Sequence, residues 1–84
     1  MAMTLQHSDH ILKARANEWL LCSEPVLGVD MSAGGTLAYG VGARFRVKFS
    51  WGDLIWCLDE NAKSVSFNRE QMAALDRAPT RPGL

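Results

Sequence analysis

The sequence predicts a small α+β domain with an N-terminal helix, an antiparallel β-meander of three to five strands, and a short C-terminal helix. Apolar residues recur at helical spacing near the start of the chain, residues 43–49 alternate strictly between apolar and charged, and a helix-capping pair stands near residue 68. A chain of 84 residues suffices for one domain. We assign this domain to residues 1–78 and expect the proline-containing residues 79–84 to form a flexible tail.

The first helix is expected over residues 8–22. Ser8 is a good N-cap residue, and Asp9 places a negative charge in the first turn, where the helix dipole favours it. The apolar stripe of this helix is expected to consist of Leu12, Ala16, Trp19 and Leu20. Pro25 prevents a longer helix, because the residue before a proline is disfavoured in the α conformation.

A β-hairpin is expected next, with strands at residues 26–31 and 36–39. Residues 32–35, Ser-Ala-Gly-Gly, have the composition of the turn between them. Glycine weakens an ordinary strand and permits bulges or close backbone approach. A bulge, a close backbone approach or both are therefore expected at Gly28, Gly40 and Gly42.

The clearest strand signal lies at residues 43–49, Ala-Arg-Phe-Arg-Val-Lys-Phe. Successive strand residues point to opposite faces of a sheet, so this alternation predicts one buried and one exposed face. The buried face is expected to hold the apolar residues Phe45, Val47 and Phe49. The exposed face is expected to hold the cations Arg44, Arg46 and Lys48.

Two turns would continue this strand into a three-stranded meander. A turn at Trp51–Gly52 would set Val47 opposite Trp56. A second turn at Glu60–Asn61 would set Trp56 opposite Val65. This register gathers the large apolar residues of all three strands on one face, and a slip of one residue in either turn would separate them.

The same register leaves Ile55 and Cys57 on the other, exposed face. Residues 50–59 have an alternative interpretation as a helix, since Ser50 could cap it with Asp53 at the third position. The strand is favoured because Trp, Ile and Cys suit strands.

The last element is expected to be a helix over residues 69–77. Asn68 would cap it, and Gln71 at the third position would complete a capping box. Met72 and Leu75 would then face the core.

Composition limits the function classes. Nine basic and nine acidic residues give a net charge of zero, which argues against binding to nucleic acid by bulk charge. Two cysteines are too few for a secreted disulfide scaffold of this size. The N-terminus lacks the features of a signal peptide, and no apolar run is long enough to span a bilayer. We therefore expect a cytoplasmic protein that does not contact membranes.

No catalytic, metal or cofactor site is expected. His7 and His10 could share a face and bind a metal with Cys22 or Cys57, but the spacing is not that of a zinc site. Cys57 would lie beside Arg46, and a neighbouring cation can activate a thiol. A packed structural cysteine is the favoured interpretation, so the protein is not expected to be an enzyme.

The exposed sheet face is the main candidate for a binding site, because two short helices can cover only one face of a small sheet. The residues expected to form a protein-binding surface are Arg44, Arg46, Lys48, Trp51 and Ile55. An apolar patch rimmed by cations suits contact with another protein, or with a second copy in a homodimer.

The sequence therefore predicts a small non-enzymatic protein-interaction module of bacterial or phage type, such as an inhibitor, immunity or adaptor protein. The alternative is a small nucleic-acid-binding regulator that uses the basic strand with Arg44, Arg46 and Lys48. A third class is a small enzyme or ligand carrier whose pocket forms only across a dimer interface.

Overall fold

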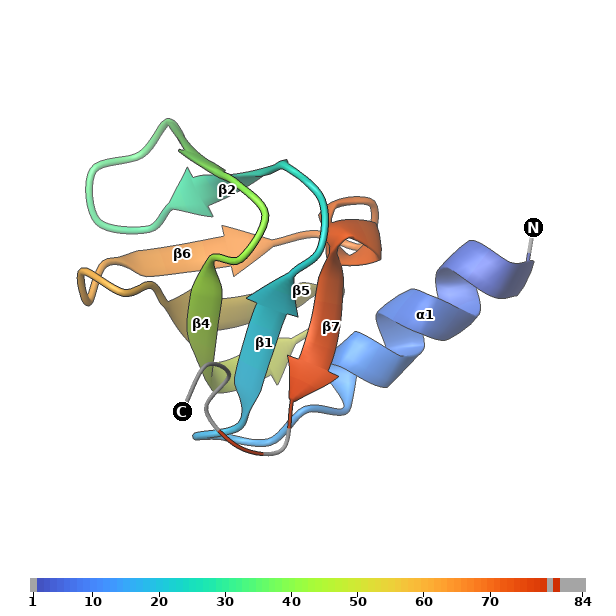
Figure 1. Ribbon diagram of the computed structural model, residues 1–84. Helices are drawn as coiled ribbons and strands as arrows, with labels where there is room; N and C mark the ends of the chain where they lie inside the picture. The colour runs from blue at the N-terminus through green and yellow to red at the C-terminus, as the bar shows by residue number, and fades with distance from the viewer. Residues whose placement is uncertain (1, 79, 81–84) are drawn as a thin grey trace.

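The computed structural model describes residues 2–78 and Thr80. Its backbone forms a single seven-stranded antiparallel sheet in the order β3-β2-β6-β5-β4-β1-β7 (Figure 1). The elements in chain order are α1 (Ala2–Leu12), β1 (Trp19–Cys22), β2 (Val26–Asp30), β3 (Thr36–Tyr39), β4 (Arg44–Trp51), β5 (Leu54–Leu58), β6 (Ser64–Phe67), the 3-10 turn η1 (Gln71–Ala74) and β7 (Leu75–Ala78).

The predicted fold class is wrong. The α+β expectation of two terminal helices around a meander of three to five strands is replaced by a larger sheet with one short helix and one 3-10 turn. The two segments expected to be helical each contribute a strand to this sheet, and these strands pair with each other. The predicted flexible tail at residues 79–84 lies, apart from Thr80, outside the described residues.

The sheet curls around its own core. Figure 1 shows β2 and β6 running across the direction of β4, β1 and β7, with α1 beside β7. Side chains from both parts of the sheet fill the space between them, and α1 and η1 contribute to it. The largest fully buried side chains are Phe45, Phe67, Ile11, Leu20, Ile55, Met72 and Leu75.

The N-terminal helix begins and ends earlier than the predicted residues 8–22, since it runs from Ala2 to Leu12. Asn17 has φ 74°, a left-handed conformation that a continuing helix excludes. The backbone N–H of Asn17 donates to the carbonyl of Val47 at 2.8 Å, and the N–H of Val47 donates to the carbonyl of Glu18 at 2.8 Å. Pairing with distant strands therefore overrides the local helical spacing around Trp19.

The C-terminal capping box forms as predicted, but the helix does not continue. Asn68 N–H donates to Gln71 Oε1 at 2.8 Å, and Gln71 N–H donates to Asn68 Oδ1 at 2.9 Å. After one 3-10 turn the chain extends into β7, which pairs with β1 from Leu75 opposite Cys22 to Ala78 opposite Trp19. Leu75 is fully buried, as expected, because it begins a core strand rather than because it lies on a helix face.

Arg69 connects α1 to the β4–β5 turn. Its guanidinium donates to Asp9 Oδ1 at 2.7 Å, to Ser8 Oγ at 2.8 Å and to Asp53 Oδ1 at 2.8 Å. The sequence predicts that Ser8 and Asp9 begin a helix, but they lie within α1. Their side chains bind Arg69 instead of capping the helix.

The β2–β3 hairpin and its turn are confirmed. Asp30 Oδ1 accepts the backbone N–H groups of Ser32 and Ala33 at 2.9 and 3.0 Å, which shapes the start of the turn. A side chain at Gly28 would collide with Val65 and Phe67, so the expected close approach is present.

Residues 50–59 form a hairpin, which confirms the strand interpretation over the helical one. Its turn falls at Gly52–Asp53, and Val47 lies opposite Cys57 rather than Trp56. A β-bulge interrupts the ladder between Val47 and Phe49.

The predicted register of β5 is wrong by one residue against β6. Against β4 it is wrong by one residue before the bulge and by two residues after it. On β6, Cys57 lies opposite Val65 and Ile55 opposite Phe67. Because the side-chain period of a strand is two, this slip turns Ile55 and Cys57 into the core and Trp56 to the outside. Alternation alone could not reveal it, since both faces of β5 are apolar.

Candidate protein-interaction surface

Large apolar side chains gather on the outer face of the sheet, over β2, β4 and β5. We call this set the outer apolar surface, and its members are Leu27, Val29, Met31, Phe49, Trp51 and Trp56. Trp51 is 74% exposed and Phe49 is 43% exposed, which is unusual for aromatic side chains of this size.

The β-bulge at Lys48 creates the aromatic half of this surface. Before the bulge, Phe45 and Val47 are buried, as the alternation predicts. The bulge inserts one extra residue, so Phe49 emerges on the outer face and lies opposite Trp56. The two ring centroids are 4.6 Å apart at an interplanar angle of 52°. The expectation that Phe49 is buried is therefore wrong.

The aliphatic half comes from β2. Val26, Gly28 and Asp30 face the core, so Leu27 and Val29 point outward. Val29 and Trp56 both lie opposite Ser66 of β6, one from each side, which places the aliphatic and aromatic halves on the same face.

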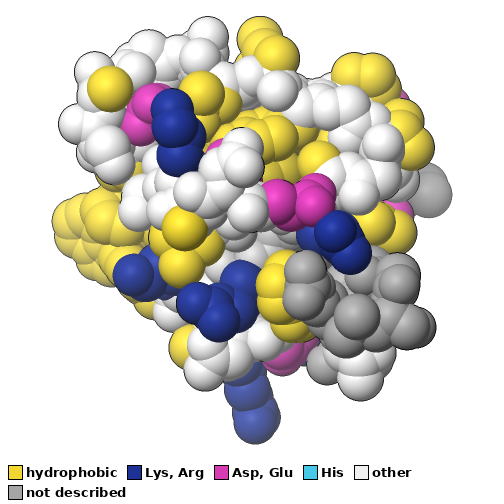
Figure 2. Space-filling view, turned by 60° about the vertical axis from the view of Figure 1, so that its left-hand side comes forward, with side chains coloured by type: hydrophobic (Ala, Val, Ile, Leu, Met, Phe, Trp, Pro, Cys, Tyr) yellow, Lys and Arg dark blue, Asp and Glu magenta, His cyan; other side chains and the backbone are white. Residues whose placement is uncertain are grey.

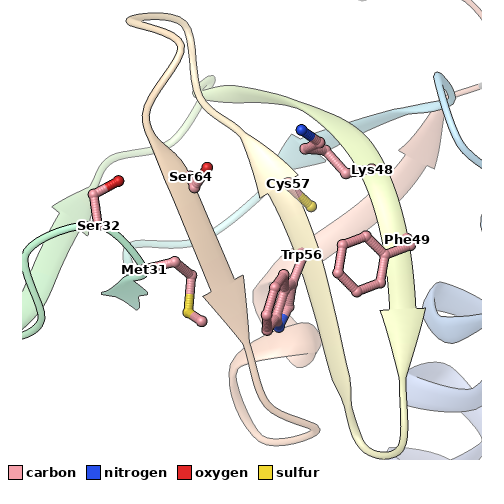
Figure 3. Close-up of a pocket in the computed structure, with 7 residues that line it drawn as sticks. All are labelled: Met31, Ser32, Lys48, Phe49, Trp56, Cys57 and Ser64. Atoms are coloured by element: carbon pink, nitrogen blue, oxygen red, sulfur yellow. The ribbon is translucent and has the colours of Figure 1, made fainter.

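A pocket of about 290 Å³ opens on this face between β4, β5 and the start of the β2–β3 turn (Figure 3). Its lining residues are Met31, Ser32, Lys48, Phe49, Trp56, Cys57 and Ser64. Figure 3 shows Met31 and Phe49 on either side of Trp56, and Lys48 extending from β4 toward the end of the pocket where Ser64 lies.

The three cations predicted for this strand have different surroundings. Arg44 is paired with Glu60 at 2.7 Å. Arg46 and Lys48 are exposed, and the side chain of neither forms an ion pair or hydrogen bond with any of the described residues. Figure 2 shows Lys and Arg side chains spread over one face of the molecule, with hydrophobic side chains among and beside them. Arg46 and Lys48 are thus available to an external anionic group.

Two predicted surface residues have opposite outcomes. Trp51 lies on the surface, as its predicted part in a protein-binding surface requires. Ile55 has no exposed area, so its predicted place on the contact surface is wrong because of the register of β5. The predicted surface omitted Phe49 and Trp56, because no pattern in the sequence marks the bulge at Lys48.

The indole N–H of Trp56 is buried and has no hydrogen-bond acceptor among the described residues. Leaving such a donor unsatisfied costs about 1–3 kcal/mol. A buried donor without a partner therefore lowers stability in the wall of the pocket, and departures of this kind are expected at functional or strained sites.

Neither cysteine has the properties of a nucleophile. Burial raises the pKa of the Cys57 thiol to about 12, so the thiol stays protonated at neutral pH. Burial also raises the pKa of Cys22, whose Sγ–H donates to the carbonyl of Glu24 at 2.7 Å. Both are free thiols packed in the core, which confirms the prediction of packed cysteines but not the exposed face that the predicted register gave Cys57.

The two histidines do not form a metal site with the cysteines. His7 Nε2 lies 2.7 Å from the carbonyl oxygen of Leu75, which engages this nitrogen as a donor. The His7 and His10 rings are 6.4 Å apart. Within residues 2–78, no group of three or more metal-ligating side chains comes together.

Comparison with protein-family models, with curated proteins and with solved structures finds no match for this chain. None of the described helices is long and apolar enough to cross a membrane.

Proposed function

We propose that the protein is a non-enzymatic protein-interaction module that binds its partner through the outer apolar surface. The observation that carries this proposal is the exposure of Trp51 and Phe49 beside an aliphatic patch on one sheet face. Contiguous apolar patches are uncommon on soluble monomers and are typical of interaction sites. Tryptophan is also among the residues that contribute most to binding energy in protein interfaces.

The charges around this surface suit the rim of an interface. Arg46 and Lys48 border the aromatic residues and have no ion-pair partner among the described residues. An apolar centre with a polar rim is the usual anatomy of a protein interface, and the rim cations favour a partner with acidic groups.

Inhibitor, immunity and adaptor proteins of bacterial or phage type act in this way, by occupying a surface on a larger protein. A second copy of the chain is another partner that such a face could take. Two buried free thiols suit a reducing compartment, which supports a cytoplasmic setting for this activity.

The test is site-specific photocrosslinking in the native host. A photoreactive amino acid at Ala38, which is exposed and lies opposite Leu27, would sample the edge of the outer apolar surface. We expect a defined adduct that is lost in Trp51→Ala and kept in Val41→Ala. Val41 is a matched control, since it is 69% exposed but lies outside the surface.

The partner identified in the adduct is then purified and titrated with each variant by calorimetry. Trp51→Ala should weaken binding by about 2 kcal/mol, or roughly 30-fold, as expected for a central aromatic. An adduct of twice the mass of the chain would indicate a homodimer, and light scattering over a concentration series would check it. Equal adducts from both variants would refute the proposal.

Single-stranded nucleic acid is the second candidate, and one observation favours it. The sequence predicts Phe49 and the cations on opposite faces, whereas the bulge brings Phe49 to the face that carries Arg46 and Lys48. Cations beside exposed aromatics can hold a phosphate backbone and stack its bases.

Fluorescence anisotropy of a labelled oligonucleotide at low salt tests this candidate. Binding should weaken steeply with salt and fall in both Lys48→Met and Trp51→Ala. No change in anisotropy at low salt would remove it. The zero net charge of the chain and the aliphatic half of the surface make the protein partner the better-supported choice.

A further inference from the structure

The pocket beside Trp56 has two chemically distinct ends. Met31, Phe49 and Trp56 form apolar walls at one end (Figure 3). Lys48 and Ser64 bring an ammonium group and a hydroxyl to the other, and Ser32 adds a second hydroxyl to the lining.

The polar groups of this pocket are not used within the protein. Lys48 has no ion-pair partner among the described residues, and the hydroxyls of Ser32 and Ser64 donate to none of them. An ammonium and hydroxyls that line the same pocket can bind a carboxylate with charge-assisted hydrogen bonds. The charge and the donors thus complement an anion, and the walls complement an apolar group.

The size of the pocket limits its occupant. Its volume of about 290 Å³ is just below the usual range for ligand pockets, so the pocket suits a group of the size of a single residue. A carboxylate and an apolar side chain that fill its two ends together are therefore best supplied by one residue. In a polypeptide this combination occurs only at the C-terminal residue.

We propose that this pocket binds the C-terminal residue of a partner polypeptide, with the carboxylate at Lys48 and an aromatic or aliphatic side chain against Phe49 and Trp56. The proposal rests on the protein-binding function above and names the part of the partner that is recognised. Capture of a chain-terminal carboxylate is a known mode of peptide recognition.

The test uses N-acetyl-phenylalanine and its primary amide as probes, followed by ¹H–¹⁵N NMR of the intact protein. The acid should shift the signals of Ser32, Ser64 and the Trp56 indole, with a dissociation constant in the millimolar range. The amide lacks the charge, so it should bind roughly fivefold more weakly. In Lys48→Met the acid should bind no better than the amide.

Lys13→Met is the matched control, because Lys13 is an exposed lysine that does not line the pocket. It should leave both dissociation constants unchanged. Equal binding of acid and amide, no shift by either probe, or an unchanged difference in Lys48→Met would each overturn the proposal. Shifts caused by an oligothymidylate but not by the acid would overturn it in favour of nucleic acid.

Failure of the C-terminal-residue proposal can be told apart from failure of the protein-binding function. Trp51 does not line the pocket. Partner binding that is lost in Trp51→Ala but unchanged in Lys48→Met would keep the function and discard the C-terminal residue as its target.

Discussion

Ile55 gives the most direct test of how β5 is placed in the sheet. The alternation of the sequence puts its side chain in solvent, whereas the structure leaves it no exposed area and sets it opposite the buried Phe67. Ile55→Ala removes roughly three methylene equivalents at about 0.8 kcal/mol each. The cavity left behind raises the expected loss in free energy of unfolding to about 3–4 kcal/mol.

Urea unfolding, followed by circular dichroism, measures this loss. A slope of about 1.5 kcal/mol per molar urea for a domain of this size converts it into a fall in the midpoint of about 2 M. Ile55→Val should cost about 1 kcal/mol, which keeps the test usable if Ile55→Ala does not fold. Trp51→Ala, at an exposed site, should stay within about 0.5 kcal/mol of the parent. If both Ile55 variants unfold at the same urea concentration as Trp51→Ala, the inward orientation of Ile55 and the register of β5 that produces it are refuted.

Three further outcomes are expected. Gly28→Ala should lower the free energy of unfolding by about 1–3 kcal/mol, because the new Cβ would collide with β6. Gly40→Ala adds its Cβ in open space and should change the free energy of unfolding by less than about 0.5 kcal/mol. Thermal unfolding of both variants measures the difference. The backbone N–H groups of Ala33 and Ser32 hold the pKa of Asp30 below its ordinary value. The ionised carboxylate therefore stabilises the fold above pH of about 4, and this stabilisation is lost as the pH falls through the lowered pKa. Asp30→Asn should therefore melt below the parent at neutral pH, and the gap should narrow in acid; a constant gap would contradict this cause. Cys57 should resist iodoacetamide in the native protein and react after denaturation, which mass spectrometry detects; rapid native alkylation would show that it is not buried.

The outer apolar surface also explains why the register of β5 matters for function. The slip that buries Ile55 turns Trp56 outward, and the bulge at Lys48 turns Phe49 outward beside it. Together they build the wall of a pocket from residues that the sequence pattern assigns to the core. A binding face is thus formed by the irregularity of β4 rather than by its regular alternation.

The features that the sequence could predict depend on interactions between residues close together in the chain. The Ser-Ala-Gly-Gly turn, the close approach at Gly28 and the capping box of Asn68 and Gln71 each depend on residues a few positions apart or on the absence of a side chain. The strand nature of residues 50–59 follows from composition as well.

The sequence by itself therefore determined the β2–β3 turn, the capping box of Asn68 and Gln71, and most of the strands. Only the tertiary structure decided that Trp19–Cys22 and Leu75–Ala78 are strands, because each is extended by pairing with the other. It also decided which face of β5 is buried. Leu54, Trp56 and Leu58 are as apolar as Ile55 and Cys57, so hydrophobicity along this strand favours neither face, and the choice depends on the hydrogen-bonded register with β4 and β6.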